Sequence, residues 1–299
     1  VVKAHAIDVL HVHYAIPHAY AGYMAKKMLA DEGFHIPIVT TLHGTDITLV
    51  GSHPFYRPAV TFSINHSDRV TAVSESLKND TLRLFDITTK IDVITNFIDI
   101  KKIEAKVMPC KRDLLAPKSH KIITHISNFR PLKRIQDVIK IFEKISSSVS
   151  SKLLMVGEGP EKQKAVDYVK EKGLTESISF LGNSNEIDKI LCYSDLFLLP
   201  SEKESFGLSA LEAMANKVPV ISSNAGGIPE VNKDNFSGYL SDVGDLDGMA
   251  KKALLLLQDD TKLKQFKEQA KEQASLFDID AIISQYEAVY SEAIAAHQF

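Results

Sequence analysis

Short apolar, β-branched runs alternate with amphipathic stretches along this chain, and the alternation occurs in two successive series. This order is typical of βαβ units, in which helices join parallel strands and cover the sheet. Residues 96–120 interrupt the rhythm, because they contain Pro109, Pro117 and the charged run 111–113 without a sustained period. We interpret this segment as an inter-domain connection. The sequence therefore predicts an α/β protein with two Rossmann-like domains facing a cleft.

The same alternation gives the expected elements. Strands are expected at residues 8–13, 36–40, 69–73 and 91–94, and then at 121–127, 152–156, 177–181, 195–199 and 218–222. Helices are expected at residues 18–30, 56–66, 76–85, 135–146, 161–171, 186–191 and 208–215. Residues 1–6 are expected to form the last turn of a helix, and the chain is expected to be helical from Gly244 to its end. The expected domains are residues 1–96 and 97–275, and residues 276–299 are expected to form a C-terminal helix that packs back toward the first domain.

The composition excludes several classes of protein. With 299 residues, 44% hydrophobic residues and a net charge of −3, the chain is neither a peptide nor a disordered or polyanion-binding protein. Cys110 and Cys192 have no C-x-x-C neighbour, so neither a disulfide framework nor a cysteine-rich zinc site is indicated. No apolar run approaches the roughly 18 residues that span a bilayer. We therefore expect a cytoplasmic protein without nucleic-acid partners or stable membrane association.

The segment after the expected strand 195–199 is the first candidate for ligand binding. Gly207 lies where a loop becomes a helix, so free backbone N–H groups and the positive helix end would face an anion. Glu212 lies near the apolar face of that helix, where a carboxylate without a partner is costly and a hydroxyl-rich ligand would supply one. A capped helix with a solvated glutamate explains these residues equally well, and both interpretations stay open.

The segment 127–134, Ser-Asn-Phe-Arg-Pro-Leu-Lys-Arg, follows the first strand of the second series. Its cations Arg130, Lys133 and Arg134 lie within five positions beside a helix start and would suit a diphosphate. Basic loop residues are often only solvated. Cations at a helix N-terminus oppose its dipole, however, and a bound anion would relieve that cost, which favours a functional role.

The segment 40–46 is the candidate site of the first domain. His43 lies at the carboxyl end of a strand and is placed to hydrogen-bond a ligand hydroxyl, whereas Asp46 could equally be the N-cap of a short helix. His11 and His13 alternate within a strand and share a face. Without acidic or cysteine partners at ligand spacing, they are predicted to be core or supporting histidines rather than metal ligands.

Glu204 and Glu212 form an E-x7-E spacing. Together with Phe206, Gly207 and the glycine-rich turn 224–230, which is a weak signal alone, they resemble the donor-site signature of the retaining GT-B glycosyltransferases of family 4. The combination is more specific than any of its parts. The resemblance extends along the whole chain through residues 10–19, 41–48 and 127–130.

The resemblance implies an enzyme that moves N-acetylglucosamine from UDP-N-acetylglucosamine to the hydroxyl of L-malate, with retention at the anomeric carbon, in the first step of bacillithiol biosynthesis. It implies no cofactor and no metal, because cationic side chains take the place of Mg²⁺. Residues 1–96 would form the acceptor side and residues 97–275 the UDP-sugar domain. No general base is obvious, which agrees with front-face transfer in which the donor phosphate receives the acceptor proton.

The resemblance also implies residue roles. Arg130 and Lys133 would hold the diphosphate and stabilise the leaving UDP. These two residues form the implied catalytic set with Glu204, which would hold sugar hydroxyls, and His43, which would contact the donor sugar. Further donor-binding residues would be Glu212 at the ribose, Ser127, Asn128 and the backbone at Phe206, Gly207 and Leu208. The acceptor-binding residues would be Tyr14, Thr41 and Asn96.

Three alternatives stay open. A family 4 enzyme could use another acceptor such as a lipid-linked sugar, although residues 18–30 offer only Lys26 and Lys27 for a basic membrane-facing patch. A non-hydrolysing sugar-nucleotide epimerase shares the architecture but needs further acids and histidines around the sugar ring. The strand, glycine-rich loop and helix with which family members begin do not precede Val1, so the chain could be a nucleotide-sugar-binding fragment with impaired catalysis. A glycosyltransferase of this type could form a homo-oligomer.

Overall fold

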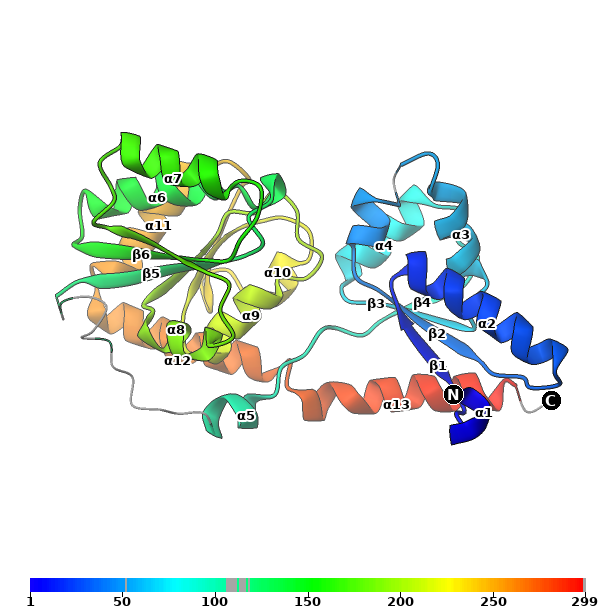
Figure 1. Cartoon of the computed structure of the whole chain (residues 1–299). Coiled ribbons are helices and arrows are strands. Elements are labelled where there is room, and N and C mark those ends of the chain that lie inside the picture. Colours follow the sequence, from blue (N-terminus) through cyan, green and yellow to red (C-terminus); the bar gives the residue numbers. More distant parts are fainter. Residues whose placement is uncertain (52, 106–111, 113–116, 118, 298–299) are drawn as a thin grey trace. The chain divides into compact units, whose positions relative to one another are not determined.

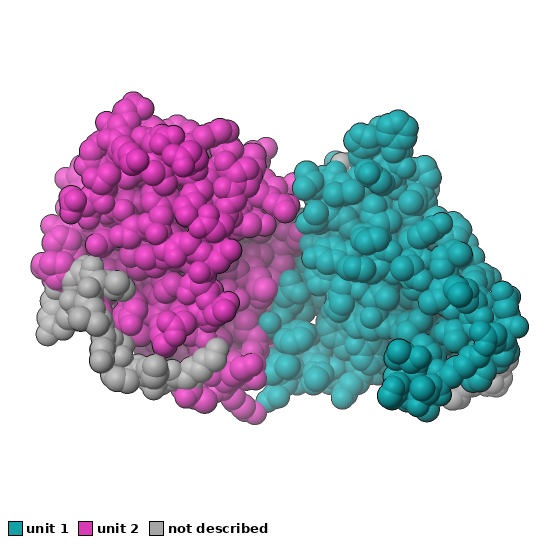
Figure 2. Space-filling view, in the orientation of Figure 1, with its two compact units in different colours: residues 1–97, 279–299 teal, residues 98–278 magenta. Residues whose placement is uncertain are grey.

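The computed structural model of the protein describes residues 1–51, 53–105, 112, 117 and 119–297. The chain divides into two compact units, which Figure 2 colours separately. Unit 1 consists of residues 1–97 and 279–299, and unit 2 of residues 98–278. Among the described residues, no helix is both long enough and apolar enough to cross a membrane.

Unit 1 is built on a four-stranded parallel sheet with the order β1-β2-β3-β4 (Figure 1). Its strands are β1 (Leu10–His13), β2 (Ile38–Leu42), β3 (Arg69–Ala72) and β4 (Ile91–Val93). Its helices are α1 (Val2–His5), α2 (Tyr20–Asp31), α3 (Arg57–Asn65), α4 (Glu75–Leu84) and α13 (Ile279–Ala295), with short turns η1 (Ala15–Ala19) and η2 (Thr45–Leu49). All five residues of β2 are buried, as expected of a parallel strand covered on both faces.

The last helix, α13, belongs to unit 1 although unit 2 separates it from the other elements in the sequence. Its Ile282, Val289 and Ala293 join one apolar cluster with Val39 of β2 and Ile94 after β4. Each buried isoleucine or valine of this cluster contributes about 1.5–3 kcal/mol relative to exposure. This burial holds α13 against the sheet.

Unit 2 contains a six-stranded parallel sheet with the order β10-β9-β8-β5-β6-β7. Its strands are β5 (Lys121–Ile126), β6 (Ser151–Val156), β7 (Ile178–Gly182), β8 (Leu196–Leu199), β9 (Val220–Ser223) and β10 (Gly238–Ser241). Its helices are α5 (Ile100–Ala105), α6 (Ile135–Ser146), α7 (Lys162–Glu171), α8 (Ile187–Tyr193), α9 (Leu208–Ala215), α10 (Ile228–Val231), α11 (Leu246–Leu257) and α12 (Asp260–Ser275), with the 3₁₀ turn η4 (Pro131–Lys133). The strand order reverses between β5 and β8, and ligands of such sheets bind at this switch point.

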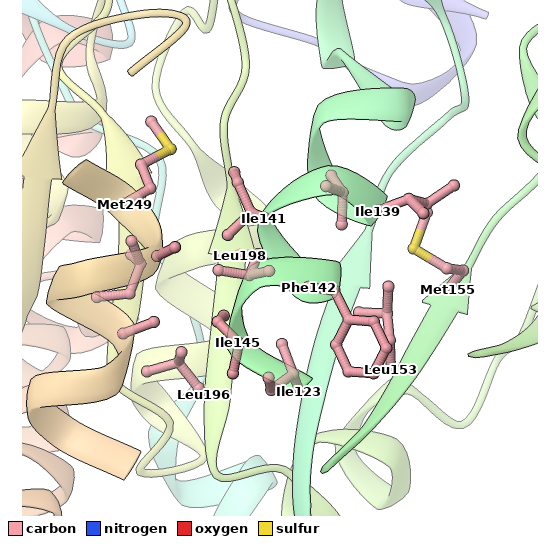
Figure 3. Close-up of a cluster of buried hydrophobic side chains, with 14 of the residues drawn as sticks. Ile123, Ile139, Ile141, Phe142, Ile145, Leu153, Met155, Leu196, Leu198 and Met249 are labelled. Carbon is pink, nitrogen blue, oxygen red and sulfur yellow. The ribbon is translucent and has the colours of Figure 1, made fainter. Parts of the chain in front are cut away.

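The core of unit 2 lies on both faces of its sheet. Successive residues of β5 point to opposite faces: Ile123 enters the large cluster with Phe142 of α6 and Met249 of α11, whereas Ile122 enters a smaller cluster with Ile190 of α8. Figure 3 shows the large cluster, in which α6 and α11 cover β5, β6 and β8. The two layers of helices fix the carboxyl ends of the strands, where the loops begin.

The expected strands and helices agree with the structure to within a few residues. Three short elements were not predicted, namely α5, α10 and β10. Pro109 and the other residues of the expected connection at 106–111, 113–116 and 118 lie outside the described residues. Arg112 is described, and its guanidinium donates to the Tyr193 carbonyl oxygen at 2.9 Å and to Asp195 Oδ2 at 2.6 Å.

Cys192 in α8 is disulfide-bonded. The sequence, which contains no indication of a disulfide framework, did not predict this bond. Cys110 lies outside the described residues.

Candidate functional site

Three loops meet at the carboxyl edge of the unit 2 sheet, and each contains residues that were expected from the sequence to contribute to the donor site. The loop after β5 and the loop after β8 are joined by the Glu202 N–H, which donates to the Leu132 carbonyl oxygen at 2.8 Å. The loop after β9 joins them through the Gly227 N–H, which donates to the Glu204 carbonyl oxygen at 3.0 Å. The structure therefore brings the three candidate segments of unit 2 together beside the switch point.

The glycine pair after β9 is explained by close backbone approach. A Cβ atom on Gly226 would lie 2.0 Å from the Glu204 carbonyl oxygen, and one on Gly227 would lie 2.4 Å from that of Ser205. Only glycine fits at this contact. The turn thus supports the backbone of the segment that contains Glu204. The Gly-Gly pair in the sequence gives no indication of this supporting contact.

Lys133 and Glu204 form an ion pair between Nζ and Oε1. Both side chains are largely buried, and Ser201 donates from Oγ to the same Glu204 oxygen at 3.0 Å. Two of the residues assigned to the catalytic set therefore contact each other. Their pairing couples the loop after β5 to the loop after β8.

The three cations of segment 127–134 have different surroundings. Arg134 donates from Nε to Asp137 Oδ2 at 2.5 Å, and Lys133 is paired with Glu204. Arg130 is exposed, and no described residue forms an ion pair or hydrogen bond with its guanidinium. Of these cations, Arg130 is the one whose charge is not compensated within the described residues.

Glu212 lies on α9, directly after the loop that contains Glu204. Its side chain is half-buried, and burial, with a smaller contribution from the Asp188 charge, raises the pKa of its carboxyl above the ordinary value. No described residue forms a hydrogen bond or ion pair with this carboxylate. A partly desolvated acceptor of this kind gains by binding ligand hydroxyls.

The remaining donor candidates lie around the start of α9 and the end of β5. Gly207 adopts φ 101° as the N-cap of α9, and Leu208 is exposed. Phe206 is buried and packs edge-on against Phe277, at 5.6 Å between ring centroids, so it is a structural anchor for the loop. Ser127 is half-buried and Asn128 exposed.

In unit 1, the candidate residues Tyr14 and His43 gather with His13 at the carboxyl ends of β1 and β2. His13 Nδ1 lies 2.8 Å from His43 Nε2, and the rings of Tyr14 and His43 lie 4.9 Å apart. Burial, with the His13 and His11 charges, lowers the pKa of His43 to about 4, and burial and His18 lower that of His13. These imidazoles are therefore neutral at pH 7.

Behind this group, a chain of hydrogen bonds leads from β2 to α13. Thr41 is fully buried, and its Oγ1 lies 2.8 Å from His11 Nε2 and 2.7 Å from Thr71 Oγ1. His11 Nδ1 lies 2.7 Å from the Tyr290 hydroxyl. Asn96, the other acceptor candidate, is half-buried in the segment after β4.

Asp46 does not serve as an N-cap, because Gly44 occupies that position of η2. Its two carboxylate oxygens instead accept from the Ala15 N–H at 2.7 Å and the Gly44 N–H at 3.0 Å. Asp46 thereby ties the turn after β1 to the turn after β2. Tyr14, next to this contact, has φ 74°, a strained value for a residue other than glycine.

His11 and His13 do share a face, with 4.5 Å between ring centroids. Within the described part of the chain, no group of three or more histidine, cysteine, aspartate or glutamate side chains is arranged to hold a metal ion.

Two parallel Rossmann-like sheets, the second with candidate residues at its switch point, define the GT-B architecture, and solved structures agree. An Anabaena protein solved with UDP and glucose, HepE, aligns with a TM-score of 0.85 at 22% identity, over 97% of this chain and 79% of that chain. Sucrose-phosphate synthase from Thermosynechococcus elongatus aligns with a TM-score of 0.84 at 20% identity, over 99% of this chain and 76% of that chain.

Sequence comparison places the chain within this class. Residues 110–273 match the family "Glycosyl transferases group 1", and residues 1–102 match "Glycosyltransferase Family 4". The chain is 46% identical over 290 residues to N-acetyl-alpha-D-glucosaminyl L-malate synthase of Bacillus anthracis, covering 96% of this chain and 75% of that relative. The protein therefore belongs to the group 1 glycosyltransferases, with a family 4 first domain, and is an enzyme that transfers a sugar.

Proposed function

We propose that the protein transfers N-acetylglucosamine from UDP-N-acetylglucosamine to the hydroxyl of L-malate with retention of configuration, the first step of bacillithiol biosynthesis. The observation that carries the proposal is the 46% identity, over 96% of this chain, with the malate synthase. The site of unit 2 supports a nucleotide-sugar donor, because an uncompensated guanidinium and a half-buried carboxylate suit phosphate and ribose hydroxyls respectively.

In this proposal the side chains of unit 2 act on the leaving group. The guanidinium of Arg130 donates to the diphosphate and stabilises the negative charge that grows on UDP as the glycosidic bond breaks. Lys133 adds N–H donors at a position that its ion pair with Glu204 fixes. The uncompensated guanidinium of Arg130, together with these donors, does the work that Mg²⁺ does in other nucleotide-dependent enzymes, so the proposed reaction needs no metal.

His43 fits a binding role better than that of a general base. With a pKa of about 4, its imidazole has little affinity for a proton at pH 7. A neutral imidazole still offers one N–H donor and one acceptor nitrogen to sugar hydroxyls. We therefore assign the proton of the malate hydroxyl to the phosphate oxygen of the departing UDP, on the face of the sugar that malate approaches.

The test is an assay with UDP-N-acetylglucosamine and a panel of acceptors: L-malate, D-malate, L-lactate and a lipid-linked sugar. UDP release shows turnover, and the NMR coupling constant of the product's anomeric proton shows its configuration. We expect UDP release that depends on L-malate and an α-configured product. Release without any acceptor, preference for another acceptor or a β-configured product would each overturn the proposal.

A lipid-linked acceptor receives less support from the structure. Of the two lysines on α2, Lys26 is bonded to Asp68, with Nζ–O distances of 2.7 and 2.6 Å, and its charge is compensated. Lys27 lies over the ring of Tyr23. This leaves α2 without the basic cluster that attracts an anionic membrane surface.

A further inference from the structure

His125 occupies the point in the unit 2 sheet where the strand order reverses. It is fully buried on β5, near the rings of Phe129 and Phe197, whose centroids lie 6.2 and 6.4 Å away. The paired register of β5 and β8 consists of Ile123 with Leu196 and Thr124 with Phe197. One residue further on, the His125 side chain reaches β8, because its Nδ1 lies 2.8 Å from the Leu198 carbonyl oxygen.

This contact fixes the tautomer of His125. A backbone carbonyl oxygen can only accept a hydrogen bond, so Nδ1 carries the hydrogen atom. Burial, assisted by the Lys133 charge, lowers the pKa of the ring to about 4, against the opposing effect of the Leu198 contact. The imidazole is therefore neutral at pH 7, and Nε2 carries a lone pair and no hydrogen.

The tautomer of His125 determines how Ser127 can form hydrogen bonds. Ser127 follows β5 at the edge where the three loops meet. Its Oγ lies 2.8 Å from His125 Nε2. Because Nε2 can only accept, the Ser127 hydroxyl must donate its single hydrogen to it. The oxygen of Ser127 then presents only lone pairs to anything else that it contacts.

We propose that His125 is a positioning residue which makes Ser127 an obligate hydrogen-bond acceptor in the donor site, so that Ser127 binds an O–H or N–H group of the nucleotide sugar and not its diphosphate. The inference rests on the proposed function for the identity of the ligand. Phosphate oxygens at pH 7 only accept hydrogen bonds, so they gain nothing from a serine whose hydrogen is already committed. The hydrogen that Ser127 accepts belongs to the uridine or to the transferred sugar.

The charges of the neighbouring segment fit this division of roles. Arg130 presents donors only, as a phosphate requires, and no described residue compensates its charge. Ser127 lies three residues earlier and presents an acceptor. A nucleotide sugar carries both kinds of group, so one loop can bind its anion and its hydroxyls with separate side chains.

The tautomer is tested first, by ¹⁵N NMR of the imidazole in the folded wild-type protein. We expect a protonated Nδ1, an unprotonated Nε2 and no titration of His125 near neutral pH. In Ser127→Ala the Nε2 resonance should shift, because that nitrogen loses its donor. The opposite tautomer, or a ring that titrates near neutral pH, overturns the inference without any need for a ligand.

The binding half is tested by calorimetry of Ser127→Ala with UDP and UDP-N-acetylglucosamine, and by competition with inorganic pyrophosphate. We expect a loss of affinity of roughly three- to tenfold, the effect of one neutral hydrogen bond. If the affinities for UDP and for UDP-N-acetylglucosamine both fall, the donated hydrogen belongs to the uridine. If only the affinity for UDP-N-acetylglucosamine falls, the donated hydrogen belongs to the sugar. Weaker pyrophosphate binding, or no loss for any ligand, overturns the inference. Thr124→Val, which removes a buried β5 hydroxyl bonded to Ser194, is the control.

A double-mutant cycle tests whether His125 acts through Ser127. In His125→Asn, the amide nitrogen takes the position of Nδ1 and keeps a donor for the Leu198 carbonyl, but nothing replaces Nε2. We expect the double variant His125→Asn/Ser127→Ala to bind UDP-N-acetylglucosamine no more weakly than Ser127→Ala alone. Additive losses would show that His125 acts by another route. Should His125→Asn not fold, the NMR measurements still decide the matter.

The outcomes separate this inference from the proposed function. If the wild-type protein glycosylates L-malate but Ser127→Ala binds every ligand normally, only the inference fails. If malate is not an acceptor but Ser127→Ala weakens UDP-N-acetylglucosamine binding as expected, only the acceptor assignment fails.

Discussion

Lys133 and Glu204 form an ion pair across 71 positions of sequence, between the loop after β5 and the loop after β8. Because Glu204 compensates the charge of Lys133, the pair offers a diphosphate little net charge. Arg130, on the same loop as Lys133, has no such partner among the described residues. The arrangement separates a cation that fixes the two loops from a cation that is available to the leaving group.

The first prediction therefore concerns Arg130. Arg130→Ala should lower kcat/KM by on the order of a hundredfold or more, because it removes donors aimed at charge that develops in the transition state. The melting temperature should not change, since the side chain is exposed. Arg83→Ala, which removes an exposed arginine of α4, is the matched control and should leave kinetics unchanged. Near-normal turnover of a folded Arg130→Ala protein would remove Arg130 from the mechanism.

The sequence predicted most of this fold because strands such as β2, β6, β8 and β9 are buried on both faces and are rich in apolar or β-branched residues. The strand β10 was not predicted, because it begins with Gly238 and depends on contacts with residues distant in sequence. A Cβ on Gly238 would lie 1.8 Å from the Val220 carbonyl oxygen, and Asn232 beside it donates to Ser222 Oγ at 2.9 Å. Neither contact can be inferred from hydrophobic periodicity or from strand propensity.

The candidate segments were likewise predictable, since loops after parallel strands meet at one edge of the sheet. The sequence did not predict, however, which charged residues of these segments form ion pairs. The sequence shows three cations in segment 127–134, but only the fold brings Glu204 to Lys133 and leaves Arg130 exposed. His125 was missed altogether, because a histidine inside an apolar strand gives no sign of its partners.

The second prediction uses the raised pKa of Glu212. Because the folded state holds this proton more tightly than the unfolded state, the ionised carboxylate destabilises the fold above its raised pKa and costs nothing below the ordinary value of 4.5. Glu212→Gln should therefore melt at a higher temperature than the wild type at pH 7, with the difference vanishing at low pH.

The same variant should bind the donor less well. Its KM for UDP-N-acetylglucosamine should rise more than its KM for malate, because the charge-assisted bonds to the ribose are lost. Melting curves across the pH range, together with both KM values, show whether Glu212 binds the donor. A lower melting temperature with unchanged kinetics would make Glu212 a structural residue.

The third prediction concerns Asp46. In Asp46→Asn, one carboxylate oxygen becomes an NH₂ group, so either the Ala15 N–H or the Gly44 N–H faces a donor and loses its partner. A buried N–H without a partner costs about 1–3 kcal/mol. The melting temperature of unit 1 should fall, and the KM for malate should rise more than that for the UDP-sugar, because Tyr14 and His43 flank the two turns.

The exposed Asp31→Asn at the end of α2 is the control for Asp46→Asn and should change neither quantity. Equal effects on both KM values would show that Asp46 supports the fold of unit 1 without a selective effect on the acceptor.

The last prediction concerns the acceptor. Malate carries two carboxylates beside its hydroxyl, so a pocket that selects it leaves donors unpaired when L-lactate binds, and lactate should be a poor acceptor. At pH 7 the imidazoles of His13 and His43 are neutral, since their pKa values are lowered. A malate carboxylate bound beside His13 stabilises the imidazolium form of that residue and raises its pKa.

Malate binding should therefore take up protons, and the affinity for malate should increase as the pH falls from about 8 to about 6, through the histidine range. Calorimetric titration in two buffers with different ionisation enthalpies measures the proton uptake directly. His13→Gln should reduce the uptake, whereas His35→Gln, which changes an exposed histidine that precedes β2, should not. Malate affinity that is independent of pH, with no proton uptake, would place the acceptor carboxylates away from these histidines.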